Sequence, residues 1–391
     1  MRTRRTPVRS STRPSRAARP QSHRPARRAT TLPPPAPRTP PPHNLRAMAA
    51  PRHDRPPTRF AARAPGRVNL IGEHTDYTGG LVLPMAIDRG TTIEGVRTPG
   101  GDTVELTSAD EPAPARIPLP VTDPAAASPA WGRYVAGVAA ELGPRATAIR
   151  ARVTTDLPIG AGLSSSAALE VAASLAMHPD PMPVLERAQL CRRAEHRATG
   201  VPCGIMDQLA SCAGIAGHAL LVDCHSLAIE PVPFPDDLQV VVRFVARRAL
   251  AGSAYADRVA QCAAAEREIG PLRLADPAAA ETIADPVARR RARHVTRENA
   301  RVRDFVAALR AADARALGAL LLATHASLRD DFEVSTPAMD AAVDAAAREP
   351  GVLGARLMGG GFGGCIVVLA HADARLDGWR VRPSPGASTL P

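Results

Sequence analysis

The feature that most constrains this chain is a glycine-rich turn between an extended segment and a helix. Residues 158–163 (Pro-Ile-Gly-Ala-Gly-Leu) are followed by three serines and two alanines at 164–168. The pattern predicts a strand over 147–155 and a helix from about Ser164 to Met177. Small residues let a ligand approach the backbone, and the N–H groups and dipole of a helix start favour an anion. The alternative is an ordinary serine-capped helix. Three serines directly after Gly-x-Gly-Leu favour the phosphate site.

Several phosphate-binding and covalent enzyme classes are excluded by composition. The sequence contains no lysine, so every strongly basic residue is arginine. A Walker A loop needs its lysine, as do the protein-kinase fold and Schiff-base enzymes. No Gly-x-Ser-x-Gly occurs either, so the serine-rich turn is not a nucleophile elbow. The turn must therefore bind phosphate by other means.

The first 58 residues differ in composition from the rest of the chain. They hold fourteen arginines, fourteen prolines and a single acid, Asp54. Such a segment has too few large apolar residues to form a core, and we expect a disordered tail. A targeting segment, a nucleic-acid-binding arm and a start at Met48 are the alternatives. The net charge of +11 resides in this tail. We therefore expect no nucleic-acid partner for the rest of the protein.

The remaining residues predict a two-domain α+β fold. Extended segments are expected at 66–72, 81–97, 102–107, 218–224, 238–245, 354–357 and 365–370, in addition to 147–155. Helices are expected near 131–142, 164–177, 182–199, 204–214, 254–268 and 286–347. The strands and helices do not alternate regularly as they do in doubly wound folds. With 391 residues the chain is too long for one core, and we expect domains at 59–225 and 226–391.

Cysteine spacing and hydropathy predict the compartment. The six cysteines form no CxxC pair and show no zinc-ligand spacing, so we expect reduced, mostly buried thiols in a cytoplasmic protein. No apolar run reaches the roughly 18 residues needed to cross a membrane. We also expect a monomer.

A second polar cluster lies in residues 66–80, where a short apolar run ends at Gly72. Four hydrogen-bonding side chains follow within five positions: Glu73, His74, Asp76 and Tyr77. Gly79 and Gly80 then allow a tight turn. Most loops of this kind are plain polar turns. Donors and acceptors at this density also suit a polyol, whose hydroxyl groups each need an oriented partner.

A third segment, residues 200–208, breaks one helix at a proline and starts another after Gly204. Asp207 then lies in a first helical turn, where the helix dipole favours its charged form. Such an acid is usually only a stabilising charge. Glu195, at the end of the preceding helix, is by itself typical of a solvated surface acid. Its position would nevertheless let it face the same cleft as Asp207.

These three segments, together with the glycine cluster at 357–365, resemble the galactokinases of the GHMP small-molecule kinase superfamily. The segment 66–80 is similar to the galactokinase signature, with Thr78 in place of the commoner Asn. The serine-rich turn is similar to the ATP-binding motif of the superfamily. The four motifs occur in the order typical of the family, from about Arg63 onward. The resemblance implies a GHMP kinase fold with the active site between the two domains.

The resemblance also implies a reaction and the residues that perform it. The γ-phosphoryl group of ATP would pass to the anomeric hydroxyl of α-D-galactose, the first committed step of galactose catabolism. Asp207 matches the proposed base, and Arg67 matches the arginine beside it. Ser166 and Glu195 match Mg²⁺ ligands. The expected ATP contacts are Gly160, Ala161, Gly162, Leu163, Ser164, Ser165 and Ser166. The expected sugar contacts are Arg67, Glu73, His74, Asp76, Gly204, Asp207 and Tyr255.

Two departures from the family pattern and two rival functions accompany this prediction. Arg243-Phe244-Val245 replaces small polar residues before the segment that carries Tyr255. After Ala370 the family's last helix is missing, so the C-terminal domain is shortened and we expect exposed apolar surface there. The rival functions are a non-catalytic sensor of galactose and ATP, and a kinase for N-acetylgalactosamine or arabinose. Transfer of phosphate to galactose separates the sensor from the enzyme, and a substrate panel separates the sugars.

Overall fold

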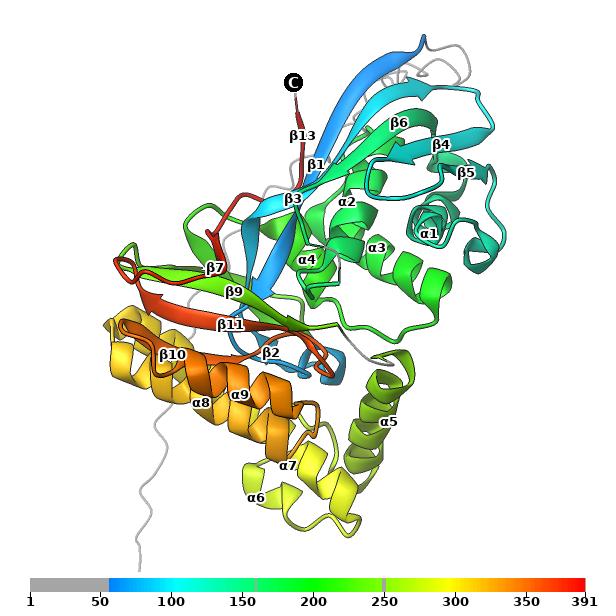
Figure 1. The fold of residues 1–391 in the computed structure, drawn as a ribbon. Coiled ribbons are helices and arrows are strands. Elements are labelled where there is room, and N and C mark those ends of the chain that lie inside the picture. Colours follow the sequence, from blue (N-terminus) through cyan, green and yellow to red (C-terminus); the bar gives the residue numbers. More distant parts are fainter. Residues whose placement is uncertain (1–55, 159, 248–250, 391) are drawn as a thin grey trace, which may run out of the picture. The chain divides into compact units, whose positions relative to one another are not determined.

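The computed structural model describes residues 56–158, 160–247 and 251–390, with only the backbone described at 251–253. The predicted tail lies outside the described residues except for 56–58. The architecture is α+β as expected, because helices pack on three sheets in which nearly all strand pairs are antiparallel. Figure 1 shows the arrangement of these elements.

The first sheet has six strands and carries the segment that leads into the predicted sugar loop. Strand β1 is exposed on one face at its start and buried on both faces from Ala64 onward, because elements from the second half of the chain cover its end. Only the pair β4–β6 is parallel. In sheet order the strands are β13 (Ser388–Leu390), β1 (Thr58–Asn69), β3 (Pro84–Thr98), β6 (Ala148–Thr155), β4 (Thr103–Ser108) and β5 (Ala115–Pro118).

Four helices pack beside this sheet and form the first hydrophobic core with it. Val171 of α2 and Leu209 of α4 pack with Ile93 of β3 in this core. The helices are α1 (Gly132–Leu142), α2 (Ser165–Met177), α3 (Val184–Thr199) and α4 (Met206–Ala213). Short 3₁₀ turns occur at η2 (Asp76–Thr78), η3 (Pro124–Ala126) and η4 (Gly143–Arg145). All four predicted helices in this half are confirmed, with ends shifted by at most two residues.

Two smaller sheets follow. The four-stranded sheet runs in the order β10 (Val352–Leu357), β11 (Gly364–His371), β9 (Leu238–Ala246) and β12 (Trp379–Val381). The three-stranded sheet contains β2 (Leu81–Val82), β7 (His218–Asp223) and β8 (Ile229–Pro233). Strands β5, β8 and β13 were not predicted, because each is short and two of them contain proline.

The predicted helical region 286–347 is divided into three helices by two capped breaks. Ala312 ends the first helix with a left-handed backbone (φ +51°), and the Asp313 side chain caps the next. Thr336 then caps a helix that begins with Pro337, a helix-start signal that the apolar periodicity concealed. The helices of this half are α5 (Ala251–Ile269), α6 (Pro277–Ala280), α7 (Pro286–Ala311), α8 (Ala314–Asp330) and α9 (Pro337–Ala346).

The predicted boundary at residues 225 and 226 falls in the turn between β7 and β8, which pair with each other. Strand β13 in turn pairs with β1 of the first sheet, although it belongs to the last segment of the chain (Figure 1). The exact domain limits therefore stay a prediction.

The structure shows both departures from the family pattern, the missing last helix and the segment 243–245. Residues 372–378 form no helix, and β12 follows them directly along the edge of β9. Arg243 forms a bidentate ion pair with Glu349, whereas Phe244 is 47% exposed on β9. Among the described residues, no helix is long and apolar enough to cross a membrane.

We predict that Gly318→Ala destabilises the protein, although alanine is the better helix former. Gly318 lies in α8, where an added Cβ would stand 2.1 Å from the carbonyl oxygen of Leu353 in β10. Overpacking of this kind costs about 1–3 kcal/mol, more than the ~1 kcal/mol gained from helix propensity. Denaturant unfolding measures the change. As a control, Ala312→Gly relieves a left-handed residue and should stabilise by about 0.5–1 kcal/mol. A stabilised Gly318→Ala variant would contradict the close packing.

Candidate active site

A cavity of about 380 Å³ lies where the end of β1, the starts of α2 and α4, and the glycine cluster meet. Thirteen of the predicted site residues line it: Arg67, Glu73, His74, Asp76, Gly160, Gly162, Ser164, Ser165, Ser166, Glu195, Gly204, Asp207 and Tyr255. Two others, Ala161 and Leu163, do not. Their side chains are 1% exposed and pack in the core between the sheets, so only their backbone could contact a ligand.

Arg67 and Asp207 form an ion pair at the centre of the cavity. The Arg67 Nε donates to Asp207 Oδ1 at 2.7 Å, and its NH2 lies 2.6 Å from the same oxygen. The guanidinium also donates to the carbonyl of Gly162 at 2.7 Å. Arg67 is 140 residues from Asp207 in the sequence, so only the fold brings the two together. The pair joins strand β1 to helix α4 and to the glycine-rich turn.

The glycine-rich turn differs from its prediction in one respect. Ser164 is the N-cap residue of α2, but its side chain makes no capping hydrogen bond. Its hydroxyl instead donates to Asp207 Oδ2 at 2.6 Å, and its backbone is left-handed (φ +59°). Both Asp207 oxygens are thereby held. The alternative of an ordinary serine-capped helix therefore does not hold at Ser164, whose side chain is directed to the carboxylate on α4 instead of to the first-turn amides.

A group of carboxyl side chains lies behind the turn. Glu195 Oε2 accepts from Gln208 Nε2 at 2.5 Å, and Ser166 donates to the same carboxyl group. Burial and the negative charge of Asp207 raise the pKa of Glu195. Gln208 also donates to Glu170 Oε2 at 3.2 Å, and burial raises the pKa of that carboxyl well above its usual range. Two buried carboxyl groups are therefore close together here, and their raised pKa values favour the protonated forms.

Glu73 is held by the second half of the chain. Its Oε1 accepts from Arg356 NH1 at 3.0 Å and from the backbone N–H of Gly359 at 2.9 Å. Burial alone would raise the pKa of this carboxyl, but the Arg356 and Arg67 cations outweigh it and the pKa is lowered. Glu73 is thus ionised and fixed before any sugar arrives.

His74 belongs to a cluster of rings. Its Nδ1 lies 3.1 Å from the Tyr77 hydroxyl, and its ring centroid is 4.6 Å from that of Phe332 and 5.6 Å from that of Tyr255. Burial lowers the pKa of His74 to about 3, so the imidazole is neutral. Its Nε2 is buried and makes no hydrogen bond of standard geometry among the described residues, although a contact between the ring and the Gly360 backbone acts to raise the pKa. A sugar hydroxyl would supply such a hydrogen bond.

Asp76 and Gly204 are in close contact. A Cβ atom at position 204 would stand 1.9 Å from Asp76 Oδ2, so only glycine fits beside this carboxylate. Burial raises the pKa of Asp76 to about 7, and the negative charges of Asp207 and Glu73 reinforce the effect. Asp76 is the acid in this loop that titrates near neutral pH.

Sequence reasoning missed several lining residues. They are Tyr134, Val201, Cys203, Met206, Gly359, Gly360, Gly361 and Phe362. The last four belong to the glycine cluster, and three others belong to the segment 200–208, so position within a motif could have indicated them. Tyr134 gave no such signal. Arg243, Phe244 and Val245 do not line the cavity.

Metal binding by protein side chains alone is not indicated. Across the described ranges, no three His, Cys, Asp or Glu side chains are grouped so that they could hold a metal ion. Five of the cysteines are free thiols, namely Cys191, Cys203, Cys212, Cys224 and Cys262.

Sequence models of known families match three parts of the chain. The galactokinase galactose-binding signature matches residues 51–96. The N-terminal domain of GHMP kinases matches 133–215, and their C-terminal domain matches 305–380. The cavity is lined by residues from the first two regions and from the glycine cluster inside the third.

Individual galactokinases are also similar to this chain. Galactokinase from Homo sapiens is 45% identical over 335 residues, covering 81% of this chain and 84% of that protein. Galactokinase from Chloroflexus aurantiacus is 42% identical over 357 residues, covering 84% and 89%. The crystal structure of Lactococcus lactis galactokinase complexed with galactose superposes with a TM-score of 0.79 at 30% identity. It covers 85% of this chain and 95% of that chain.

We predict that Asp76→Asn stabilises the protein increasingly as the pH rises from about 4 to 7. The native carboxyl keeps its proton up to about pH 7 whereas an ordinary Asp loses it near 3.8. Over this window the native state binds the extra proton, so wild-type stability falls as the pH rises, by on the order of 1 kcal/mol or more. The asparagine side chain does not ionise, so the variant does not lose stability in this way.

Urea unfolding of both proteins at pH 5 and pH 8 measures the effect. Asp223→Asn is the control, because hydrogen bonds from His225 and Ser226 help to lower the pKa of Asp223 against the effect of burial. Its difference from wild type should not grow as the pH rises. A difference for Asp76→Asn that stays constant from pH 5 to pH 8 would contradict the raised pKa.

Proposed function

The chain belongs to the galactokinase family of GHMP kinases, and we propose that the residues lining its cavity catalyse transfer of the γ-phosphoryl group of ATP to the anomeric hydroxyl of α-D-galactose. The product is galactose 1-phosphate, and the reaction is the first committed step of galactose catabolism. One observation carries the assignment to this site. The Arg67–Asp207 pair lines one cavity together with the phosphate-type turn and the sugar-type loop.

The phosphate side is the start of α2. Gly160 and Gly162 have left-handed backbones (φ +76° and +79°) and line the cavity with Ser165 and Ser166. Because the Ser164 side chain binds Asp207, it does not block the first-turn N–H groups, which favour an anion. We place the triphosphate of ATP here, with the backbone of 160–165 as its cradle.

The carboxyl cluster behind the turn suits Mg²⁺. Magnesium in kinase sites uses one or two side-chain ligands and takes the rest from phosphate oxygens and water. Ser166 and Glu195, which are already hydrogen-bonded to each other, are the proposed ligands. A cation beside Glu195 would also relieve the repulsion from Asp207 that helps to raise its pKa. When bound, the ion neutralises charge on the phosphates of ATP.

Asp207 is placed to receive the anomeric hydroxyl. Phosphoryl transfer depends mainly on positioning and charge neutralisation. Arg67 and Ser164 hold the two oxygens of Asp207, so its carboxylate has a fixed direction. The Arg67 cation would offset charge on the transferring group. Proton acceptance by Asp207 and simple orientation of the hydroxyl require the same geometry.

The sugar is proposed to lie against the loop 73–77. Glu73, His74 and Asp76 would each contact a hydroxyl group, and Gly204 and Tyr255 would close the pocket. The buried Nε2 of His74 and the titrating Asp76 are polar groups that a sugar hydroxyl would satisfy.

Location and assembly complete the proposal. Free thiols are typical of a reducing compartment, and on that basis we propose that the enzyme acts in the cytoplasm. The expectation of a monomer stays a prediction, which sedimentation of the purified protein would test.

We predict that Asp207→Ala lowers kcat for galactose phosphorylation by about 10²–10⁴-fold, because the acceptor hydroxyl loses its oriented partner. The galactose dissociation constant should change much less. A coupled ADP-release assay and calorimetry measure the two quantities. Glu186→Ala is the matched control, since Glu186 is also a first-turn acid but is exposed and lies outside the cavity. A wild type that binds galactose but turns over no faster than Asp207→Ala would overturn the enzyme assignment.

We predict that Glu195→Gln raises the Mg²⁺ concentration for half-maximal activity by about tenfold or more, in line with the effect of losing one ion contact. Titration of activity with Mg²⁺ at fixed ATP measures it. The control is Glu141→Gln, which removes a carboxylate paired with Arg193 and Arg197 away from the cavity. Equal Mg²⁺ requirements in Glu195→Gln and wild type would remove Glu195 from the proposed ligands.

A further inference from the structure

Three side chains on one face of α7 bind the backbone of the segment 69–81. His294 Nε2 lies 3.1 Å from the carbonyl oxygen of Glu73. Glu298 Oε1 accepts from the N–H of Gly72 at 2.9 Å, and Asn299 Oδ1 accepts from the N–H of Leu81 at 2.7 Å. All three side chains are buried. His294 and Glu298, four residues apart, lie on the same side of the helix, and Asn299 extends that side toward Leu81.

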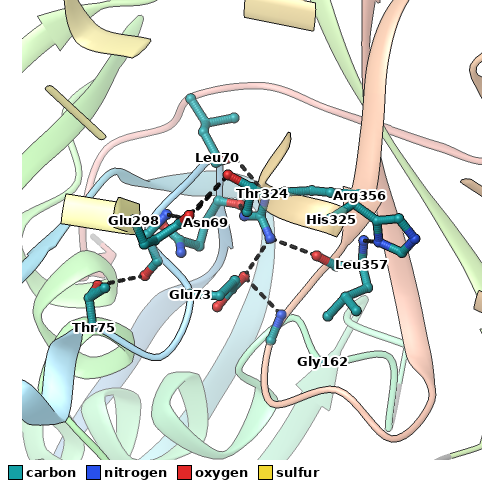
Figure 2. A network of polar contacts seen from close by, with 12 residues as sticks. Asn69, Leu70, Glu73, Thr75, Gly162, Glu298, Thr324, His325, Arg356 and Leu357 are labelled. Atoms are coloured by element: carbon teal, nitrogen blue, oxygen red, sulfur yellow. Dashed lines mark hydrogen bonds and ion pairs between the residues drawn. The ribbon is translucent and has the colours of Figure 1, made fainter. Parts of the chain in front are cut away.

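Arg356 of β10 binds the same segment from another direction. Figure 2 shows its guanidinium between the backbone of Asn69 and Leu70 and the carboxylate of Glu73. It donates to the Leu70 carbonyl at 2.9 Å and to the Asn69 carbonyl at 2.5 Å. Arg356 is fully buried. None of these four side chains lines the cavity.

The segment holds itself together only in part. Its internal backbone bonds are Gly79 N–H to Asp76 and Gly80 N–H to Thr75. The N–H of Gly72 and the carbonyl of Glu73 depend on α7 for their hydrogen bonds, and leaving a buried backbone group without a partner is unfavourable. Thr75 and Thr78 add side-chain bonds inside the segment, so its conformation depends in part on them and in part on elements from the second half of the chain.

The proton arrangement at His294 is fixed by its partners. The Glu73 carbonyl can only accept, so Nε2 must carry the proton. Burial lowers the pKa of His294 to about 4, so the ring is neutral; its Nδ1 lies 2.9 Å from the Ser327 hydroxyl, which itself donates to Asp331 Oδ2 at 3.1 Å. A neutral donor of constant direction therefore faces Glu73 across the whole neutral range.

We propose that His294, Glu298, Asn299 and Arg356 are positioning residues for the sugar, which set its affinity by fixing the backbone that carries Glu73, His74 and Asp76. The inference rests on the proposed function of the cavity. The side chains act through the loop and do not touch the sugar. Groups that orient binding residues in this way commonly change affinity by about tenfold or more when removed. The phosphate side, on α2 and α4, is held by other contacts and should be unaffected.

The principal test compares two buried side chains of α7. Asn299→Ala removes the bond to Leu81 and an intrahelical bond from Nδ2 to the Val295 carbonyl. Thr296→Ala removes only intrahelical bonds, to the Ala292 and Arg293 carbonyls. The control thus reproduces the loss inside the helix without the loss at the loop. Calorimetry with galactose, steady-state KM for galactose and for ATP, and amide hydrogen exchange at Leu81 are measured on the full chain.

We expect Asn299→Ala to raise the dissociation constant and KM for galactose about tenfold, to leave KM for ATP within twofold, and to speed exchange at Leu81. Thr296→Ala should match wild type in all four measured quantities. Unchanged galactose affinity in a folded Asn299→Ala protein would overturn the inference, as would equal losses for galactose and ATP or an equal loss in Thr296→Ala. A wild type that neither binds nor phosphorylates galactose would instead refute the proposed function itself.

A second pair of variants covers the case in which Asn299→Ala does not fold. His294→Gln keeps an N–H donor near the position of Nε2, whereas His294→Leu removes it. We expect His294→Gln to bind galactose within threefold of wild type and His294→Leu to bind about tenfold more weakly. Equal affinity in both variants would show that the donor to Glu73 has no positioning role.

Discussion

The buried ion pair between Arg356 and Glu73 joins the two halves of the chain at the point where the cavity begins. Both side chains are buried, and Arg356 uses its remaining donors on three backbone carbonyls. Removing one partner of such a pair typically costs about 3–5 kcal/mol, because the other charge stays buried without compensation. The strand that ends at Asn69 and the glycine cluster that begins at Met358 therefore have one relative position, and the cavity depends on it.

The rest of the cavity is organised by negative charge. Asp76, Glu195 and Asp207 face it from different elements, and Arg67 is the cation that pairs with one of them. The raised pKa values of Asp76 and Glu195 reflect this crowding and the loss of water. Ligand-binding sites commonly retain such electrostatic strain, because substrates and ions relieve it on binding. The crowding is consistent with a site that receives a sugar and a metal–nucleotide complex together.

The sequence contained the elements and the motifs but not the contacts between them. The strand–turn–helix at 147–177 and the first-turn position of Asp207 could be predicted because propensity, glycine and capping signals are local. The hydrogen-bond partner of the Ser164 side chain could not be predicted, because Asp207 lies 43 residues away in the sequence and a local capping bond is the nearer choice. Arg356, one of 49 basic residues, has no local signal of burial, and its importance follows only from the register of β10. For the same reason, the sequence does not distinguish His294, Glu298 and Asn299 of α7 from the residues of an ordinary helix face.

Strand β13 gives the fold an unusual order of assembly. Residues 388–390 pair with 61–63, so the first sheet closes with residues that leave the ribosome after every other element in Figure 1. Until then β1 has an open edge, which is a template for pairing with other chains. Contacts between residues so far apart in the sequence also form slowly. By pairing with Ala61–Arg63, β13 covers part of this edge and reduces the backbone that is open to such pairing.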